Sequence, residues 1–389
     1  MIDIFLHRGK EQRVYGGHPW IFRSDIDRVT GPETDGVARV FSSKGAFLAM
    51  AVYNPLSMIS LRVLSRREEV IDGAFIRGRV KRALAYRRLF ADLNSCRLLF
   101  AESDGLPAVI ADSFGGVIVL QILCRGMEPF KEELVSALVE ELHPMGVYER
   151  NDVPVRELEG LEQRTGLLYG AVPERVEIQE NGVRFLVDVR QGQKTGFFLD
   201  QKENRAAIAP IVRDASVLDC FTHTGSFALH AARYGAKEVL GVDISEHACL
   251  CAQENARLNG VTDRVDFTCA NAFDFLRASL EEKRRYDVVI LDPPAFAKTR
   301  SAVEGALRGY KEINLRAMKL LKDGGFLVTC SCSQHVTPPL FQKMLLDAQK
   351  DARVQLRQME WRTQGRDHPI LPSAPETQYL KCGIYQVFK

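Results

Sequence analysis

The second half of the chain alternates short apolar runs with helix-like segments, and this alternation restricts the possible folds more than any other feature. The apolar runs predict strands at residues 216–220, 239–242, 265–267, 286–291 and 326–329. Helical patterns lie at residues 226–234, 245–259 and near 313–321. Strands that alternate with helices are typical of a parallel sheet. We therefore predict an α/β, Rossmann-like domain over residues 190–389, with a ligand site at the carboxyl ends of its strands.

Polar or reactive residues occupy each of these predicted strand ends. Asp219 lies within the first strand, Asp243 closes the second, and Cys332 closes the fifth. The third strand is followed by Asn271-Ala272, and the fourth by Asp292-Pro293-Pro294. Because the carboxyl ends of parallel strands meet at one edge of the sheet, we expect these residues to form a single site.

The loop after the first strand favours one cofactor over another. It carries a single glycine, Gly225, whereas a dinucleotide-binding loop needs three so that its backbone can close on a pyrophosphate. S-adenosylmethionine has no phosphate, but it has a sulfonium cation and an amino-acid end. Asp219 suits the ammonium of that end, Asp243 the ribose hydroxyls, and Asn271 and Ala272 can border the adenine. The expected cofactor-binding residues are Asp200, Gln201, Asp219, Phe221, Thr222, Gly225, Asp243, Ile244, Asn271, Ala272 and Asp292.

Asp219 taken alone could equally be an aspartate in a solvated turn, and its combination with Asp243 and the Asp-Pro-Pro sequence favours the cofactor. That sequence also predicts a base-binding loop. Pro293 and Pro294 have no backbone N–H groups, so they stiffen the loop and leave Asp292 facing a flat, amine-bearing ring. The expected substrate-binding residues are Pro293, Pro294 and Phe296, of which Phe296 is equally compatible with a place in the core.

Cys332 narrows the choice of base to a pyrimidine. Carbon 5 of cytosine or uracil is a poor nucleophile until a thiolate adds to carbon 6. Only a small fraction of cysteine is thiolate at neutral pH, but the residue is intrinsically very nucleophilic. Asp292 is expected to assist the addition by holding the polar edge of the ring. Cys330 lies deeper in the same strand, and we expect it to be a core thiol.

Residues 1–189 predict two further domains. Residues 1–70 contain closely spaced short strands with basic and aromatic residues, which favours a small β-barrel that binds RNA; a barrel with a merely solvated charged face is the alternative. Residues 71–189 predict a mixed α/β domain with a long basic helix at 76–93 and a hairpin around Asn181-Gly182.

Composition sets limits on the setting of the protein. Nine cysteines, an odd number scattered through apolar contexts, favour reduced thiols in the cytoplasm, and no ligand set for a metal accompanies them. No apolar stretch approaches the ~20 residues that span a bilayer, so no membrane partner is expected. A net charge of +2 neither requires nor excludes a nucleic-acid partner, because a local basic face is enough.

Several segments along the whole chain carry a family resemblance. Besides the strand-end motifs they are His18-Pro19-Trp20-Ile21-Phe22, Tyr53-Asn54-Pro55, Asp367-His368-Pro369 and the hallmark segment, residues 192–201, with the sequence Gly-Gln-Lys-Thr-Gly-Phe-Phe-Leu-Asp-Gln. With these segments the chain resembles the bacterial and archaeal ribosomal RNA large-subunit 5-methylcytosine methyltransferases that carry an N-terminal PUA domain. The resemblance implies a PUA barrel at 1–70, a middle domain at 71–189 and a class I methyltransferase domain at 190–389.

The resemblance also implies that S-adenosylmethionine is the cofactor and that large-subunit ribosomal RNA is the substrate. The catalytic residues that we predict are Cys332, Asp292 and Lys194. Many RNA cytosine methyltransferases place a second cysteine after the paired prolines, where this chain has Ala295. The base that removes the carbon 5 proton is therefore unnamed, with a water held by Lys194 or His368 as the candidates.

Two other interpretations stay open: a methyltransferase for guanine N7 or another base, which needs no cysteine nucleophile, and a non-catalytic RNA-binding assembly protein. The intact acidic and Pro-Pro positions weigh against the second. The sequence does not give the oligomeric state, so a homodimer also stays open.

Overall fold

The structure is a computed structural model that describes residues 1–32 and 34–389. The chain forms two compact units, each assembled from separate segments. The first unit comprises Met1–Ile178, Val187–Leu199 and Arg366–Thr377, and the second comprises Gln179–Leu186, Asp200–Gly365 and Gln378–Lys389. The chain therefore passes between the units five times, after residues 178, 186, 199, 365 and 377.

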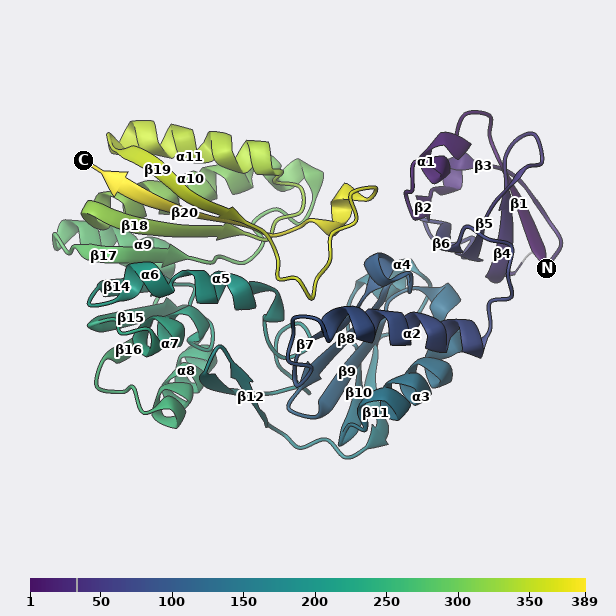
Figure 1. Ribbon diagram of the computed structural model, residues 1–389. Coiled ribbons are helices and arrows are strands. Elements are labelled where there is room, and N and C mark those ends of the chain that lie inside the picture. The colour runs from purple at the N-terminus through teal and green to yellow at the C-terminus, as the bar shows by residue number, and fades with distance from the viewer. Residues whose placement is uncertain (33) are drawn as a thin grey trace. The chain divides into compact units, whose positions relative to one another are not determined.

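The N-terminal part of the first unit is a six-stranded sheet with the order β2-β6-β5-β4-β1-β3. Its strands are β1 (Ile2–Leu6), β2 (Trp20–Ile21), β3 (Ile26–Thr30), β4 (Gly36–Phe41), β5 (Phe47–Tyr53) and β6 (Leu61–Ser65). Strands β1 and β4 are parallel, and the other pairs are antiparallel. Alternating residues such as Ile2, Ile4 and Leu6 of β1 belong to one apolar core, which also includes Val14 of the short helix α1 (Glu11–Tyr15). Figure 1 shows these strands and α1 near the N-terminus.

The middle part of the first unit is a five-stranded sheet with the order β11-β10-β9-β8-β7. The strands are β7 (Ser95–Phe100), β8 (Val109–Phe114), β9 (Val117–Ile122), β10 (Gly146–Asn151) and β11 (Arg164–Gly170). Helices α2 (Gly73–Arg87) and α3 (Lys131–Leu142) pack on it through a shared core, and the short helix α4 (Val155–Leu158) follows β10.

The prediction of a basic helix at 76–93 is confirmed for the presence of a helix, but its predicted bounds are wrong. It begins at Gly73, because Asp72 caps it by accepting a hydrogen bond from the backbone N–H of Phe75 at 2.9 Å. It ends at Arg87, and Asp92 instead organises a turn by accepting the N–H of Asn94 at 2.9 Å. The last predicted turn of helix is therefore a loop that leads into β7.

Two later segments complete the first unit. In the hallmark segment, Thr195 donates its hydroxyl to the buried carboxylate of Asp112 at 2.5 Å. In the segment Arg366–Thr377, the Asp367 carboxylate accepts the backbone N–H of Arg97 at 2.9 Å. The guanidinium of Arg87, which is fully buried, donates to the backbone carbonyl of Asp367 at 2.8 Å. The first unit is thus tied together by groups that lie up to 280 residues apart in the sequence.

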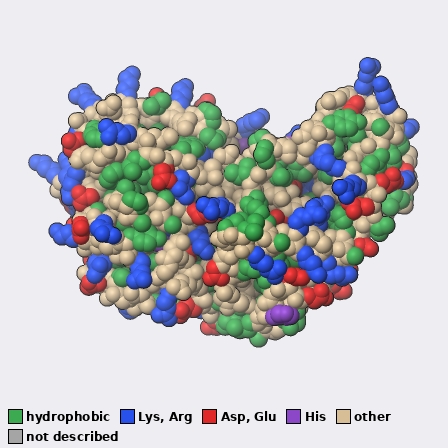
Figure 2. All heavy atoms as spheres, viewed as in Figure 1, with side chains coloured by type: hydrophobic (Ala, Val, Ile, Leu, Met, Phe, Trp, Pro, Cys, Tyr) green, Lys and Arg blue, Asp and Glu red, His purple; other side chains and the backbone are tan. Residues whose placement is uncertain are grey.

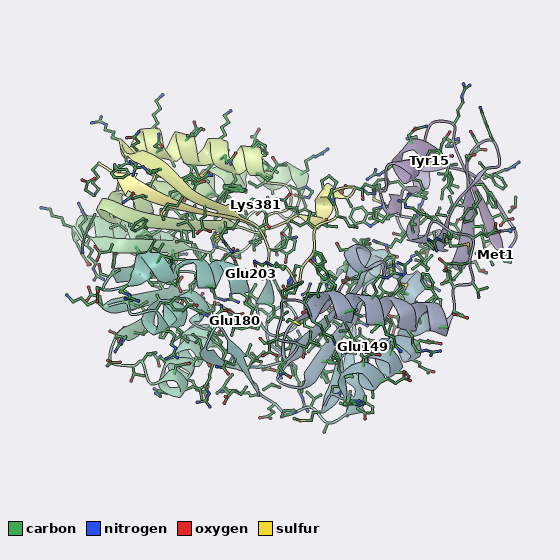
Figure 3. All side chains as sticks on the ribbon, in the orientation of Figure 1. Met1, Tyr15, Glu149, Glu180, Glu203 and Lys381 are labelled. Carbon is green, nitrogen blue, oxygen red and sulfur yellow. The ribbon has the colours of Figure 1, made fainter. Side chains whose placement is uncertain are left out.

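The predicted hairpin is confirmed as β12 (Val176–Glu180) and β13 (Val183–Val187). Asn181 and Gly182 at its turn have φ values of +50° and +80°, the pair of positive angles that a two-residue hairpin of type I′ needs. Glu180, labelled in Figure 3, forms a fully buried ion pair with Arg205 at 2.6 Å within the second unit.

The second unit is built on a seven-stranded sheet with the order β16-β15-β14-β17-β18-β20-β19. The strands are β14 (Ser216–Cys220), β15 (Glu238–Asp243), β16 (Val265–Cys269), β17 (Tyr286–Leu291), β18 (Leu321–Ser331), β19 (Gln355–Arg362) and β20 (Lys381–Phe388). All neighbouring pairs from β16 to β18 are parallel, and β20 runs antiparallel to both of its neighbours. This is the predicted α/β fold, with strand order reversing between β14 and β17.

Helices cover both faces of this sheet (Figure 1). They are α5 (Lys202–Ala207), α6 (Ala209–Val212), α7 (Ser226–Arg233), α8 (Glu246–Asn259), α9 (Ala272–Glu281), α10 (Val303–Leu320) and α11 (Pro338–Ala352). Successive residues of a strand pack into the cores on opposite faces of the sheet. Leu218 packs with α9, α10 and α11, whereas Val217 packs with α6 and α7. A strand buried on both faces explains the unbroken apolar runs of the sequence.

Two predicted bounds in this unit are wrong. The helix expected near 313–321 begins at Val303, and Leu321 already belongs to β18, where it is the Cα partner of Tyr286. Helices α9 and α11 and strand β19 are present without having been predicted. Among residues 1–32 and 34–389, no helix combines the length and the apolarity that crossing a membrane requires.

Candidate active site

The carboxyl ends of β14, β15, β17 and β18 carry the predicted site residues of the second unit. Strand β14 pairs with β15 on one side and with β17 on the other, and Cys220 is the Cα partner of both Val242 and Leu291. These registers place Asp243 and Asp292, the residues that follow those partners, at the same edge as the end of β14. The structure therefore brings the three acidic residues Asp219, Asp243 and Asp292 together.

Asp219 is fully buried, and only one of its two carboxylate oxygens has hydrogen-bond partners among the described residues. Its Oδ2 accepts the hydroxyl of Thr222 at 2.5 Å and the backbone N–H of Ala228 at 3.0 Å. Its Oδ1 is buried and has no hydrogen-bond partner among the described residues. Burial raises the pKa of this carboxyl from 3.8 to about 7, and the charges of Asp292 and Asp243 contribute to the increase. A buried acceptor of this kind fits the ammonium group of S-adenosylmethionine.

The loop between β14 and α7 adopts an unusual backbone. Phe221 and His223 have φ values of +64° and +52°, in the left-handed region that costs non-glycine residues about 1–3 kcal/mol each. Gly225 has φ +84°, and a Cβ on it would lie 2.9 Å from the ring of Phe267. Glycine is therefore needed here for both backbone angle and space. The end of β15 holds the loop in this conformation, because the backbone N–H of Thr222 donates to the carbonyl of Val242 at 3.1 Å.

Asp243 holds this loop in place from the end of β15. Its Oδ2 accepts the backbone N–H of His223 at 2.9 Å, and its Oδ1 accepts that of Ser245 at 3.0 Å. Each carboxylate oxygen has a second lone pair, so the half-buried side chain retains capacity for two hydroxyl donors. Ile244, the next residue, is 70% exposed at the same strand end.

Asn271 and Ala272 lie where α9 begins. The Asn271 side chain caps the helix by accepting the backbone N–H of Phe273 at 2.9 Å, and it is exposed, whereas Ala272 is buried. An asparagine directly before the apolar positions of α9 is the capping signal by which this unpredicted helix could have been found.

Asp292 is oriented by a short chain of side chains. Its Oδ1 accepts the side-chain amide of Gln201 at 2.8 Å, and the carbonyl oxygen of Gln201 accepts the amide of Asn204 at 2.6 Å. The neighbouring Asp200 is buried and accepts the hydroxyl of Tyr379 at 2.7 Å. The predicted residues Asp200 and Gln201 therefore belong to the network around the strand ends, and Asn204 and Tyr379 are members that the sequence did not reveal.

The residues after Asp292 differ in their surroundings. Pro293 is buried, Pro294 is exposed, and Phe296 is half-buried. The Phe296 ring lies 4.6 Å from that of Tyr310 and 6.3 Å from that of Phe221, measured between ring centroids. Phe296 thus packs with the core beneath the site, and one of its neighbours is the strained residue Phe221.

The two cysteines of β18 have different environments. Cys330 is fully buried, and hydrogen bonding to Cys382 together with burial raises the pKa of its thiol well above the usual value. Cys332 directly follows the last residue of β18, is half-buried, and lies with its Sγ 3.9 Å from the carbonyl oxygen of Pro293. The strand end therefore places the thiol of Cys332 beside the Asp-Pro-Pro sequence, while Cys330 is a core residue.

Lys194 and His368 both belong to the first unit. Lys194 is exposed in the hallmark segment, and its ammonium lies 4.3 Å from the ring centroid of Phe198. His368 is buried and bonds through Nδ1 to the Asp367 carboxylate at 2.8 Å. The catalytic role of Lys194 stays a prediction. Across the residues that the structure describes, no group of three metal-binding side chains occurs.

Comparison with known proteins agrees with this architecture. Residues 4–66 match the family of PUA-like domains, and residues 160–369 match the S-adenosylmethionine-dependent methyltransferases. The chain is 42% identical over 388 residues to ribosomal RNA large subunit methyltransferase I of Aeromonas salmonicida (strain A449), with 98% of each chain covered. It is 43% identical over 392 residues to the protein of the same name from Pseudoalteromonas translucida (strain TAC 125), with 99% of each covered.

Solved structures support the same fold over the full length. A protein from Streptococcus mutans assigned to the SAM-dependent methyltransferases superposes with a TM-score of 0.84 at 19% identity, covering 99% of this chain and 100% of that chain. A methyltransferase solved in complex with SAH superposes with a TM-score of 0.86 at 20% identity and the same coverage. The match over residues 160–369 and the full-length relatives show that the chain belongs to the family of S-adenosylmethionine-dependent methyltransferases that includes the proteins named ribosomal RNA large subunit methyltransferase I.

Proposed function

We propose that this protein forms 5-methylcytosine in large-subunit ribosomal RNA, with Cys332 as a covalent nucleophile. The observation that carries the proposal is the position of the Cys332 thiol, 3.9 Å from the carbonyl of Pro293 at the mouth of neighbouring strands. A thiol beside Asp292 serves a pyrimidine, because attack at carbon 6 is what makes carbon 5 reactive. The names of the full-length relatives support ribosomal RNA of the large subunit as the substrate.

The residues of the site divide the chemistry between them. S-adenosylmethionine supplies a methyl group on a positively charged sulfur. Asp219 holds the ammonium end of the cofactor and Asp243 its ribose. Asp292, fixed by Gln201, accepts a hydrogen bond from the exocyclic amine of cytosine, and its orientation keeps the ring edge in register with Cys332. The thiolate adds to carbon 6, carbon 5 takes the methyl group, and loss of the carbon 5 proton lets the thiolate leave.

The target base has to leave its stack before it can reach such a pocket. Extrusion costs a few kcal/mol from a duplex and less from a loop, so single-stranded ribosomal segments are the better substrates. With this function we propose three domains: a PUA barrel at 1–70, a middle domain at 71–189 and a methyltransferase domain at 190–389. We also propose that the protein acts in the cytoplasm.

RNA recognition is assigned to the first unit. A cavity of about 540 Å³ is lined there by residues of the β6 end, of α2 and of the loop around Leu371. Four of its lining residues are arginines, against two glutamates; the six are Arg66, Arg67, Arg79, Arg82, Glu69 and Glu102. Arginine binds phosphate oxygens through a planar fork of N–H groups, so this basic cavity supports binding of the RNA backbone.

The decisive experiment compares two cysteine variants on RNA that contains 5-fluorocytidine. The fluorine replaces the proton that must leave carbon 5, so the covalent adduct should accumulate and be visible as a shifted band in a denaturing gel. We expect Cys332→Ala to abolish both trapping and 5-methylcytidine formation, measured by nucleoside mass spectrometry. The matched control, Cys330→Ala, removes a buried thiol two residues away and should largely spare both.

A wild-type rate of methylation by Cys332→Ala would overturn the nucleophile assignment. The modified nucleoside then decides between the alternatives. Formation of 7-methylguanosine would identify a guanine methyltransferase that needs no thiol. Absence of any methylated nucleoside, with intact RNA binding, would identify an assembly protein.

A further inference from the structure

The ammonium group of Lys381 is buried next to the proposed nucleophile. Lys381 is the first residue of β20 and is labelled in Figure 3. It is 1% exposed, although burial of a charged ammonium is among the most costly events in folding. Strand pairing explains its place, because Lys381 is the Cα partner of Ser331, the residue immediately before Cys332.

The hydrogen bonds of Lys381 aim its ammonium at the turn that contains Cys332. Nζ donates to the backbone carbonyl of Ser333 at 2.7 Å and to that of Tyr379 at 2.9 Å. Both acceptors are neutral carbonyl groups, so neither of them neutralises the positive charge of the buried ammonium. An ammonium at this position can interact favourably with a thiolate on Cys332.

The surroundings of Cys332 oppose a negative charge on its sulfur. Asp292 carries a negative charge on the loop after β17, and Tyr310 faces the same turn from α10 through bonds to Ser331 and Ser333. Cys382 lies next to Lys381 on β20. The carboxylate of Asp292 and the partial burial of Cys332 both disfavour a thiolate, and a nearby cation offsets them.

The charges of Lys381 and Cys332 influence each other. Burial lowers the pKa of Lys381 to about 8, and a negative charge on Cys332 raises it. By the same attraction, the ammonium favours the thiolate.

We infer that Lys381 is a positioning residue that holds a positive charge beside Cys332 and favours its thiolate over its thiol. The thiol proton passes to the amine of Lys381 when that amine is neutral, which gives a thiolate and an ammonium. The sulfur electron pair then forms the bond to carbon 6, and the same pair returns to sulfur when that bond breaks. The role in the pyrimidine reaction rests on the proposed function, whereas the effect on the thiol does not.

The test measures the thiol without RNA. Full-length protein is treated with iodoacetamide over a range of pH, and alkylation of the Cys332 peptide is followed by mass spectrometry. We expect the pH midpoint of the alkylation rate to rise by on the order of one unit or more in Lys381→Met and to stay near the wild-type value in Lys381→Arg. Lys322→Met, which removes an exposed ammonium from β18, is the matched control and should leave the midpoint unchanged.

An unchanged midpoint in Lys381→Met would overturn the inference. If Lys381→Met does not fold, as judged by urea unfolding, the reciprocal measurement decides: NMR titration of the Lys381 Cε signal. Its pKa should fall in Cys332→Ala relative to wild type, and an equal pKa would also overturn the inference. A shifted midpoint in a protein that forms no 5-methylcytidine would retain the role of Lys381 and reject the proposed function, so the two failures are distinguishable.

Discussion

The carboxylate of Asp219 shares the end of β14 with two other carboxylates, so its protonation depends on what binds beside it. The sequence was sufficient to predict that Asp219, Asp243 and Asp292 meet, because strand ends of a parallel sheet meet whatever the loops do. It was not sufficient to predict that one oxygen of Asp219 would be satisfied locally while the other is buried with no partner among the described residues. Nor did it reveal Lys381 or Asn204, whose relevance comes from pairing between segments far apart in the chain.

Cofactor affinity should depend on pH through Asp219. The pKa of its carboxyl in the folded protein is raised from 3.8 to about 7, so the folded state holds this proton where the unfolded chain has lost it. Binding of an ammonium favours the ionised form and must release the proton below about pH 7. Affinity for S-adenosylmethionine should therefore rise with pH up to about 7 and then level off.

Calorimetry over this pH range measures the effect, and proton release on binding appears as a dependence of the heat on the buffer. Asp219→Asn cannot ionise, so it should bind more weakly and lose this pH dependence. The sign for stability is opposite: without cofactor, the contribution of Asp219 to the free energy of unfolding is present below 3.8 and is lost as pH rises to about 7. A wild-type affinity that is flat across this range would reject the assignment of Asp219.

At the scale of elements, prediction succeeded where burial alone determines the pattern. Strands β14 and β17 were predicted to the residue, since their apolar runs are buried on both faces of the sheet. Helix α10 was predicted too short, although Ala306, Tyr310, Ile313 and Ala317 already recur at helical spacing from its first turn. Strand β19 could not be predicted in this way, because its residues are exposed or half-buried without a regular alternation and many of them are polar.

The arginines at the end of β6 and on α2 lead to a prediction about these elements. Arg67 and Arg82 line the cavity of the first unit and are exposed, so both can be replaced without opening the core. We expect Arg67→Ala/Arg82→Ala to weaken RNA binding and to reduce the slope of log affinity against log salt by about 0.7 for each RNA phosphate that is no longer neutralised. Filter binding at several salt concentrations measures both.

Arg353→Ala, an exposed arginine at the end of α11, is the matched control for loss of charge. It should change the slope less than the double variant does. Equal slopes for wild type and Arg67→Ala/Arg82→Ala would show that RNA phosphates lie elsewhere.

At the scale of the whole molecule, charge is nearly balanced and dispersed. The net charge is +2, and Figure 2 shows Lys and Arg side chains scattered among acidic and apolar ones on the visible face. Attraction to RNA must therefore arise from local clusters such as the arginine cavity. Composition could not locate that cluster, because its members come from β6, α2 and the loop near Leu371.

The segment Arg366–Thr377 should stabilise the first unit, although it comes from near the end of the chain. Asp367 accepts the backbone N–H of Arg97 and bonds to His368, and both partners are buried. Asp367→Ala leaves these two groups without their acceptor, so we expect a loss of about 2 kcal/mol in the free energy of unfolding of this unit.

Urea denaturation, monitored by hydrogen exchange of the backbone amides of β7 and β8, measures the loss of free energy of unfolding in the first unit. Asp351→Ala removes an aspartate from an exposed ion pair with Lys311 and should change stability much less than Asp367→Ala does. Equal stability of Asp367→Ala and wild type would mean that the segment does not stabilise the first unit through this carboxylate.

The five passages of the chain between the two units have a consequence for biosynthesis. Neither unit is contiguous, and the first one is completed only when Thr377 has been translated, close to the end of a chain of 389 residues. A ribosome that has made the barrel and the middle sheet has not yet made Asp367, so the buried guanidinium of Arg87 still lacks one of its acceptors. Folding during synthesis can therefore not give the first unit its final packing until the residues up to Thr377 have been made.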